Sequence, residues 1–231
     1  MKTCLLIAKK GPAAFLSHLE WSKAIERSLR RSGLAVAMTQ GFNQHFRISF
    51  NGALSVGEES EGEFVEVTFA ETYPPQEIFS RLSLELPRGM ELGGILPIDG
   101  LFFKLIGNKM QVAMEISVAF TECPAVAWLV PLAASFAADP ALMIEVARKS
   151  GSRQLLLRDY LRSFAIAEVS PGNLKIDMEM SILAEGSIKA KEIIHAFWRY
   201  AGIEDVICRL QLRRLNYRVW RGDKFIDPFA L

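Results

Sequence analysis

The order of the periodic segments constrains the fold of this chain more than any other feature of its sequence. Within the first hundred residues, segments with strand or helix periodicity follow one another as strand, helix, two strands, helix and strand. This is the element order of the split β-α-β, or ferredoxin-like, unit. The segments are residues 2–9, 17–32, 46–50, 61–69, 76–86 and 90–98, with residues 34–40 as a further extended stretch.

A similar order follows in the second half of the chain. Its segments are a strand at 111–120, an apolar helix at 124–138 bent by Pro131, a strand at 142–150, a hairpin at 163–183, a helix at 191–202 and a strand at 206–221. We therefore predict an α+β protein made of two tandem ferredoxin-like (βαββαβ) halves with antiparallel sheets. The predicted parts are an N-terminal domain at 1–98, a linker at 99–108 and a C-terminal domain with a hairpin insertion at 109–231.

The first predicted helix has clear ends and a basic outer face. Ser17 and Glu20 have the spacing of a capping box, and Gly33 supplies a left-handed stop. Residues 1–50 hold 8 Lys and Arg against 2 Asp and Glu, which favours an acidic partner such as RNA. A helix that only keeps its outer face in water has the same pattern. The predicted phosphate contacts on this helix are Arg27, Arg30 and Arg31.

The stretch QGFNQHFRISF, residues 40–50, is too rich in polar and aromatic side chains for a strand that only fills a core. Gly41 and Asn43 allow a tight or left-handed turn. We predict a recognition hairpin whose rim lies beside the start of the first helix and can hydrogen-bond base edges and phosphates. The rim residues are Gln40, Asn43, Gln44, His45 and Arg47, and His18 at the start of the first helix is predicted to contact RNA together with them.

The last strand carries a second group of arginines. Alternation places Arg209, Gln211 and Arg213 on one face, and a predicted bulge at Arg213-Arg214 interrupts it. Arginines mixed with aromatic rings suit phosphate contacts and base stacking, whereas a solvated edge strand protected by charge is an equally good interpretation. After the bulge, the predicted face comprises Arg214, Asn216, Arg218 and Trp220.

Two histidines are candidates for catalysis. His18 lies in the first turn of the predicted helix, where the helix dipole favours the neutral ring. If it faced His45 across a cleft, the two could act as a metal-independent acid–base pair on a ribose 2′-hydroxyl, with Arg47 holding the phosphate. A lone histidine is more often structural, and we predict that His195 is a packing or surface residue.

The composition argues against several classes of protein. The three cysteines and three histidines are scattered without metal-ligand spacing, and no glycine-rich phosphate loop occurs. We therefore expect no metal and no cofactor. No apolar run approaches the length of a membrane span, and the N-terminal stretch does not match a signal peptide. We expect a cytoplasmic protein that does not bind membranes.

Residues 15–67 resemble the radical SAM-linked protein family, a bacterial family of uncharacterised function. Its members have F-L-S-H-L-D before an arginine-bearing helix, then Q-G-F-N-P-H-P-K-I-S-F, a small glycine turn and an E-G-E strand. Looser matches at 157–161 and 186–187 extend the resemblance over nearly the whole chain. Gln44, Phe46 and Ala190 stand where the family usually has prolines, and Arg47 replaces a lysine. The loss of the two prolines on either side of His45 leaves the loop around it less rigid.

The resemblance implies a partner enzyme. Genes of the family are fused or adjacent to those of cobalamin-dependent-looking radical SAM proteins, often near ribonuclease E/G. This chain lacks the C-x-x-x-C-x-x-C that would ligate the iron–sulfur cluster, so the partner would supply it. The predicted tandem halves are also similar, at the level of fold alone, to CRISPR repeat-processing endoribonucleases, whose glycine-rich C-terminal loop is missing here.

Three functions follow as hypotheses. The first is a non-catalytic RNA-binding or substrate-presenting module that acts with a radical SAM enzyme on tRNA or rRNA. The second is a metal-independent endoribonuclease that uses His18 or His45. The third is a protein adaptor without RNA contact, in which the apolar helix at 124–138 docks the partner, although a helix of that length is usually part of a core.

Overall fold

The computed structural model describes residues 1–98, 110–121, 126–148, 151–183, 187–203, 208–221, 224–227 and 229, without the side chains of Arg148 and Arg221. The chain divides into two compact units, each of mixed α and β structure with antiparallel strand pairs. Unit 1 comprises Met1–Gly107 and Phe229–Leu231, and unit 2 comprises Asn108–Pro228. The predicted linker at 99–108 lies outside the described residues.

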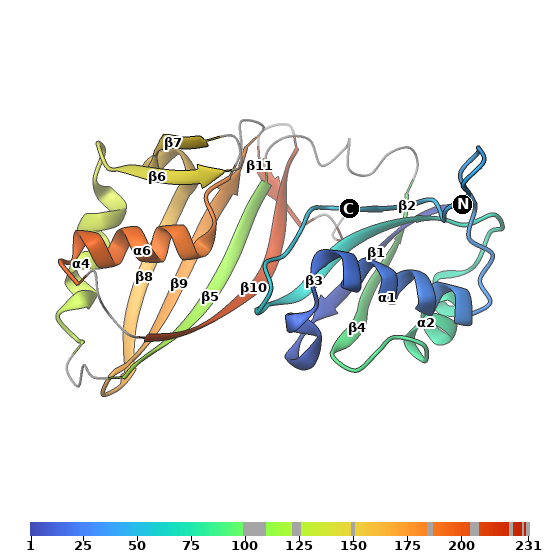
Figure 1. The fold of residues 1–231 in the computed structure, drawn as a ribbon, viewed down its shortest axis with the longest axis horizontal. Helices are drawn as coiled ribbons and strands as arrows, with labels where there is room; N and C mark the ends of the chain where they lie inside the picture. Colours follow the sequence, from blue (N-terminus) through green and yellow to red (C-terminus); the bar gives the residue numbers. More distant parts are fainter. Residues whose placement is uncertain are drawn as a thin grey trace. The chain divides into compact units, whose positions relative to one another are not determined.

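Unit 1 contains an antiparallel sheet with the strand order β4-β1-β3-β2 (Figure 1). Its connectivity along the chain is strand, helix, two strands, helix and strand, as the periodicity predicts. The elements are β1 (Lys2–Lys9), the 3-10 helix η1 (Gly11–Phe15), α1 (His18–Arg31), β2 (Ile48–Phe50), β3 (Glu58–Thr68), α2 (Pro75–Ser83) and β4 (Met90–Pro97).

The core of unit 1 lies between one face of this sheet and the two helices. Leu5 and Ile7 of β1 have the same parity as Val65 and Val67 in the paired register of β3, so all four face the helices. Each such buried aliphatic side chain contributes about 1.5 to 3 kcal/mol of transfer free energy. The helices contribute Trp21, Ile25, Leu29, Ile78 and Leu82.

The predicted ends of α1 are confirmed. The Ser17 hydroxyl accepts from the Glu20 N–H at 3.3 Å, and the Glu20 carboxylate accepts from the Ser17 N–H at 2.8 Å. Hydrogen bonds from Ser17 also lower the pKa of Glu20. Gly33 follows the helix with φ of 66°, a left-handed conformation that glycine adopts without strain.

In unit 2, antiparallel strands pair in the order β11-β10-β5-β9-β8, and β6 and β7 form a separate two-stranded sheet. Rings from α4, β8 and α6 pack together on one face of the larger sheet. The elements are β5 (Met110–Phe120), α4 (Leu129–Ala138), β6 (Met143–Arg148), β7 (Gly151–Leu156), α5 (Leu157–Tyr160), β8 (Leu161–Ser170), β9 (Asn173–Ile182), α6 (Ala190–Tyr200), β10 (Cys208–Arg221) and β11 (Lys224–Ile226).

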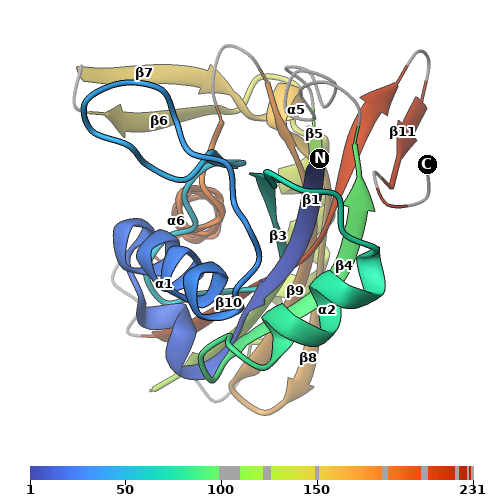
Figure 2. The same ribbon diagram turned by 90° about the vertical axis from the view of Figure 1, so that its right-hand side faces the viewer.

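Two features of unit 2 differ from the sequence-based prediction. The strand predicted at 142–150 pairs with β7 instead of joining the larger sheet, and this ribbon runs across the strands of that sheet (Figures 1 and 2). The exposed β7 segment lacks an apolar alternation that could have revealed it. The helix α4 begins at Leu129, so Pro131 lies in its first turn, where the missing N–H would have no intrahelical partner.

Within the described part of the chain, no helix is both long enough and apolar enough to cross a membrane.

The burial of Cys4 predicts a loss of stability in alkaline solution. Burial, with a smaller contribution from Glu66, raises the pKa of the Cys4 thiol from 9.0 to about 12. Above pH 9 the folded state keeps a proton that the unfolded thiol has lost, so stability falls as the pH rises towards 12. Between pH 9 and pH 10, ionisation of this thiol in the unfolded state should lower the free energy of unfolding by about 1 kcal/mol. Denaturant titrations of wild type and Cys4→Ala would measure this difference, and identical pH dependences would contradict it.

Candidate functional site

Three of the sequence blocks that carry the family resemblance meet at one small cavity in unit 1. The start of α1 contributes His18 and Trp21, the turn after β2 contributes Gly52, and the E-G-E strand contributes Glu63. Of these four residues, only His18 is a candidate predicted from the sequence. The full lining comprises Lys9, His18, Trp21, Gly52, Leu54 and Glu63.

Lys9 is a buried charge at this cavity. Only 2% of its surface is exposed, and its Nζ donates a hydrogen bond to the Leu16 carbonyl at 2.8 Å. Burial lowers the pKa of Lys9, and the nearby carboxylates of Glu63 and Glu58 partly offset this shift. Buried charges need such compensation. The attraction between Lys9 and these two glutamates therefore connects the end of β1 to the first part of β3.

Aromatic rings fix His18 at the edge of the same cavity. The His18 ring meets the edge of Phe50 at a centroid distance of 5.5 Å and lies 6.4 Å from the Trp21 ring. Phe50 also meets Trp21 edge to face at 5.5 Å. His18 is half-buried. It is therefore part of the packing between α1 and β2.

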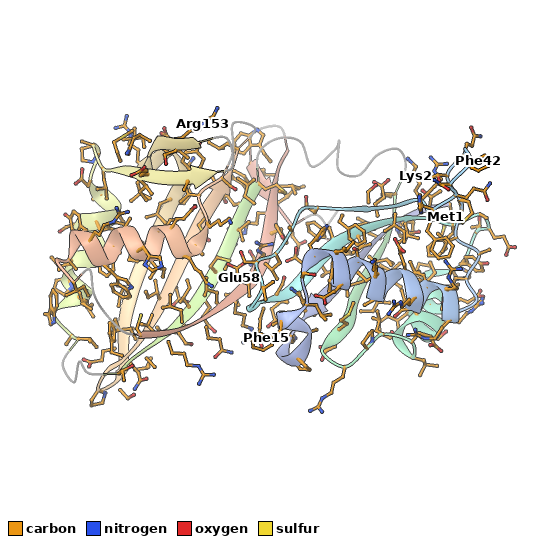
Figure 3. The ribbon with its side chains drawn as sticks, viewed as in Figure 1. Met1, Lys2, Phe15, Phe42, Glu58 and Arg153 are labelled. Atoms are coloured by element: carbon orange, nitrogen blue, oxygen red, sulfur yellow. The ribbon has the colours of Figure 1, made fainter. Side chains whose placement is uncertain are left out.

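The QGFNQHFRISF stretch forms a protruding loop closed by a short ladder. Met38 and Phe46 form an isolated bridge, and the Thr39 N–H donates to the His45 carbonyl at 2.8 Å. The turn uses Gly41 at φ of 123°, as predicted, whereas Asn43 does not adopt a left-handed conformation. Residues 40–45 are all exposed, and Phe42 lies at the outer end of the loop (Figure 3).

The structure does not bring the two candidate histidines together. The loop returns to α1 at Phe46, whose ring lies 5.1 Å from the Arg30 guanidinium, while Phe50 contacts His18. Arg30 and His18 are 12 residues apart in α1, which is about 18 Å at a helical rise of about 1.5 Å per residue. The loop rim therefore lies near the C-terminal half of α1, and its predicted place beside the helix start is wrong.

The basic residues of unit 1 have different surroundings. Arg27 and Arg30 are exposed, with Arg30 stacked on Phe46. Arg31 is held by Glu85, whose carboxylate lies 2.7 Å from its Nε and whose carbonyl accepts from its Nη2 at 2.6 Å. Phe46 and Ile48 pack on the core, so Arg47 between them is directed to the opposite face of the sheet from α1. Arg27 and Arg30 are thus the pair that shares an outer helix face.

In unit 2, two arginines of β10 lie within ion-pair distance of acidic side chains of β5 and β9. Arg213 lies 4.0 Å from Glu115, and Arg218 lies 4.0 Å from Glu179. Both share the polar face of the sheet with Arg209, which lines an open groove of about 780 Å³. The ion pairs are typical of a charged sheet surface as well as of an RNA-binding one.

The bulge in β10 falls between Arg214 and Asn216, one residue beyond the predicted place. Arg214 is therefore opposite Met114, on the other face from Asn216, and its guanidinium contacts the Tyr217 hydroxyl and ring. The predicted grouping of Arg214 with Asn216, Arg218 and Trp220 on one face is wrong, because one looped-out residue reverses the parity.

No group of three or more His, Cys, Asp or Glu side chains within the described ranges is placed to hold a metal ion.

Comparison with known proteins gives a family and no function. No curated protein matches the chain. One matching solved structure is that of an unknown protein from Galdieria sulphuraria, which is 10% identical and covers 91% of this chain and 97% of its own. Its TM-score of 0.23 does not establish a shared fold. The profile of the family described as "Uncharacterized protein conserved in bacteria (DUF2344)" matches residues 2–190. Because this match spans most of the sequence, the chain belongs to the DUF2344 family.

Proposed function

We propose that this chain is a non-catalytic RNA-binding or substrate-presenting module that acts with a radical SAM enzyme on tRNA or rRNA. The observation that carries the proposal is the fully exposed ring of Phe42 at the end of the 40–45 loop. An aromatic ring without packing partners offers a platform on which an unpaired base can stack. Gln40, Asn43 and His45 are exposed beside it and can bind base edges.

Positive charge near the base of this loop supports the same proposal. Arg30 lies over Phe46 at the point where the loop returns to α1, and Arg27 is exposed one turn earlier. A guanidinium stacked on a ring keeps donors that can bind phosphate. Base stacking at the loop and phosphate contacts along α1 would together track a single strand.

The ion-paired arginines of β10 support the proposal less directly. Arg209 lines the open groove of unit 2 beside Gln211 and Ser117, so it is the best placed of these arginines for a phosphate. Arg213 and Arg218 would have to exchange carboxylate partners for RNA. We therefore assign the main RNA contacts to unit 1.

The proposal also includes the finer fold. The order β4-β1-β3-β2 in unit 1 has the same pattern as β10-β5-β9-β8 in unit 2, once β6 and β7 are set aside as an insertion. Both are consistent with a ferredoxin-like unit, which is a frequent scaffold for RNA binding on an open sheet. The radical SAM partner is proposed from the family resemblance alone.

Removing the Phe42 ring tests the proposal. Loss of one base stack should weaken RNA binding by about 1 to 3 kcal/mol, which is about 5- to 150-fold in Kd. Phe42→Ala and wild type would be titrated with total tRNA and with rRNA fragments over a salt series. Phe79→Ala is the matched control, because Phe79 is an exposed aromatic of α2 that the proposal leaves unused.

The outcomes separate the three functions. An equal loss of RNA affinity in Phe42→Ala and Phe79→Ala would reject the RNA-binding module. The absence of salt-sensitive RNA binding by wild type would also reject it. Cleavage of the RNA in EDTA would instead support the endoribonuclease that uses His18 or His45. Capture of a radical SAM protein by the chain after nuclease treatment, without RNA binding, would favour the adaptor.

A further inference from the structure

The last residue that the structure describes, Phe229, packs on the sheet of unit 1. Its ring stacks on that of Phe64 in β3, with a centroid distance of 5.8 Å and an interplanar angle of 24°. Leu5 and Ile7 of β1 face the helices, and Leu6 between them is opposite Phe64 in the paired register. Leu6 and Phe64 therefore point to the other face of the sheet. Phe229 thus lies on the face that is opposite the helices.

Two glycines leave room for side chains on this face. Gly94 of β4 is opposite Leu6 in the register. A Cβ at Gly94 would lie 3.0 and 3.1 Å from two carbons of the Phe229 ring, which is closer than ordinary van der Waals contact. On the other side of Leu6, a Cβ at Gly62 of β3 would overlap the Leu6 side chain. A glycine inside a strand often marks such a close approach. Leu6, Gly62, Phe64 and Gly94 together form what we call the ring-binding site.

The surroundings of the ring-binding site favour an uncharged occupant. Cys4 and Glu66 form the next outward-facing pair of β1 and β3, two residues along from Leu6 and Phe64. Both are buried, with 0% and 5% of their surface exposed. A phosphate or a carboxylate placed on this face would be repelled by the Glu66 carboxylate. An apolar ring that stacks on Phe64 has no such cost.

The docked residue keeps part of its surface in water. Phe229 is half-buried and Asp227 is exposed. Contacts of one half-buried ring open more readily than the paired strands of a sheet. We propose that the ring-binding site accepts a single aromatic side chain and that the C-terminal segment is a releasable strap whose Phe229 occupies the site. Release of the strap opens the site to an aromatic side chain of a partner protein. The inference does not rest on RNA binding.

A peptide supplied in trans tests the proposal. The probe is fluorescein-labelled KFIDPFAL, the sequence of residues 224–231, titrated into the full-length chain and followed by fluorescence anisotropy. We expect saturable binding by Phe229→Ala, in which the site is empty. Wild type should bind about tenfold more weakly, because a strap docked about nine-tenths of the time leaves the site open for the remaining tenth. A peptide with alanine in place of the residue that corresponds to Phe229 should not bind.

Neighbouring glycines provide a matched pair of variants in the Phe229→Ala background. Gly94→Ala should weaken peptide binding about fivefold or more, because the new Cβ occupies space that the ring needs. Gly93→Ala should leave peptide binding unchanged. A Cβ at Gly93 would meet only Leu6 atoms, at an ordinary contact distance of 3.8 Å.

Three results would overturn the proposal. They are the absence of peptide binding by Phe229→Ala, equal binding by Phe229→Ala and wild type, and equal effects of the two glycine substitutions. Should Phe229→Ala fail to fold, NMR of wild type decides. We expect nuclear Overhauser effects between the Phe229 ring protons and the Gly94 α protons, and their absence would reject the docked strap. No RNA enters these measurements, so this inference and the proposed function fail separately.

Discussion

Replacing Gly89 with alanine is expected to lower the free energy of unfolding by about 2 to 5 kcal/mol. Gly89 adopts φ of +85°, where an L side chain costs about 1 to 2 kcal/mol. A Cβ there would also overlap the Lys10 carbonyl oxygen and lie 3.2 Å from the Ala13 Cβ. Relieving an overlap with backbone adds about 1 to 3 kcal/mol. Chemical denaturation of wild type and Gly89→Ala would measure the sum.

Gly57 provides a closely matched control. Its φ is +84°, yet a Cβ at Gly57 meets no heavy atom within 4 Å. Both glycines lie against η1, since the Gly57 N–H donates to the Ala14 carbonyl and the Gly89 carbonyl accepts from Lys10. Gly57→Ala should therefore cost only the backbone strain of about 1 to 2 kcal/mol. Equal losses in the two variants would show that the close approach at Gly89 contributes nothing.

The expected effect at Gly89 bears on the candidate site. The 2.7 Å hydrogen bond from Lys10 to Gly89 fixes the chain between β1 and η1, immediately after Lys9. The Lys9 ammonium reaches the Leu16 carbonyl just beyond η1. A displacement of η1 would therefore disturb the buried lysine and the cavity that it lines.

The elements of unit 1 were predictable because local signals determine them. The capping box at Ser17 and the glycine stop at Gly33 mark the ends of α1 without reference to the rest of the chain. The strand predicted at 61–69 lies largely within β3 and is about three residues too late at its start. The pairing of β6 with β7 was not predictable, because an exposed strand has no buried face to give an alternation.

The buried charges at the cavity were missed although a signal was present. Lys9 has the same parity in β1 as Leu5 and Ile7, and Glu63 has the parity of Val65 in β3. Charged residues at core-facing positions of two paired strands indicate a buried polar cluster. The predicted site residues nevertheless do not include Lys9.

The position of the loop rim could not be derived from the sequence. Its place along α1 depends on which α1 residues contact Phe46 and Phe50, and the contacting pairs, Arg30 with Phe46 and His18 with Phe50, are far apart in the sequence. Spacing in the sequence leaves that register undetermined. The prediction placed the loop that carries His45 beside His18. In the structure, Phe46 packs on Arg30 and Phe50 packs on His18, so the two histidines lie near different parts of α1.

Removing the Phe136 ring is expected to destabilise unit 2 by about 3 to 5 kcal/mol, the usual cost of replacing a buried phenylalanine with alanine. Phe136 of α4 is fully buried, and its ring centroid lies 5.2 Å from those of Phe164 and Phe197 and 5.5 Å from that of Tyr200. These contacts join α4 to β8 and α6, so the cavity left by alanine cannot close by moving one helix. Thermal or denaturant unfolding followed by near-ultraviolet circular dichroism would report the loss.

Trp128 precedes α4 and is 45% exposed, so it separates the two interpretations of this apolar segment. If α4 serves the core, Phe136→Ala lowers stability by several kcal/mol while Trp128→Ala costs about 0.5 kcal/mol or less, as is usual for surface substitutions. If the segment instead docks a partner protein, Trp128→Ala should abolish capture of that partner and leave stability unchanged. A small stability loss in Phe136→Ala would contradict the core assignment, because the ring would then contribute little of the packing that its contacts imply.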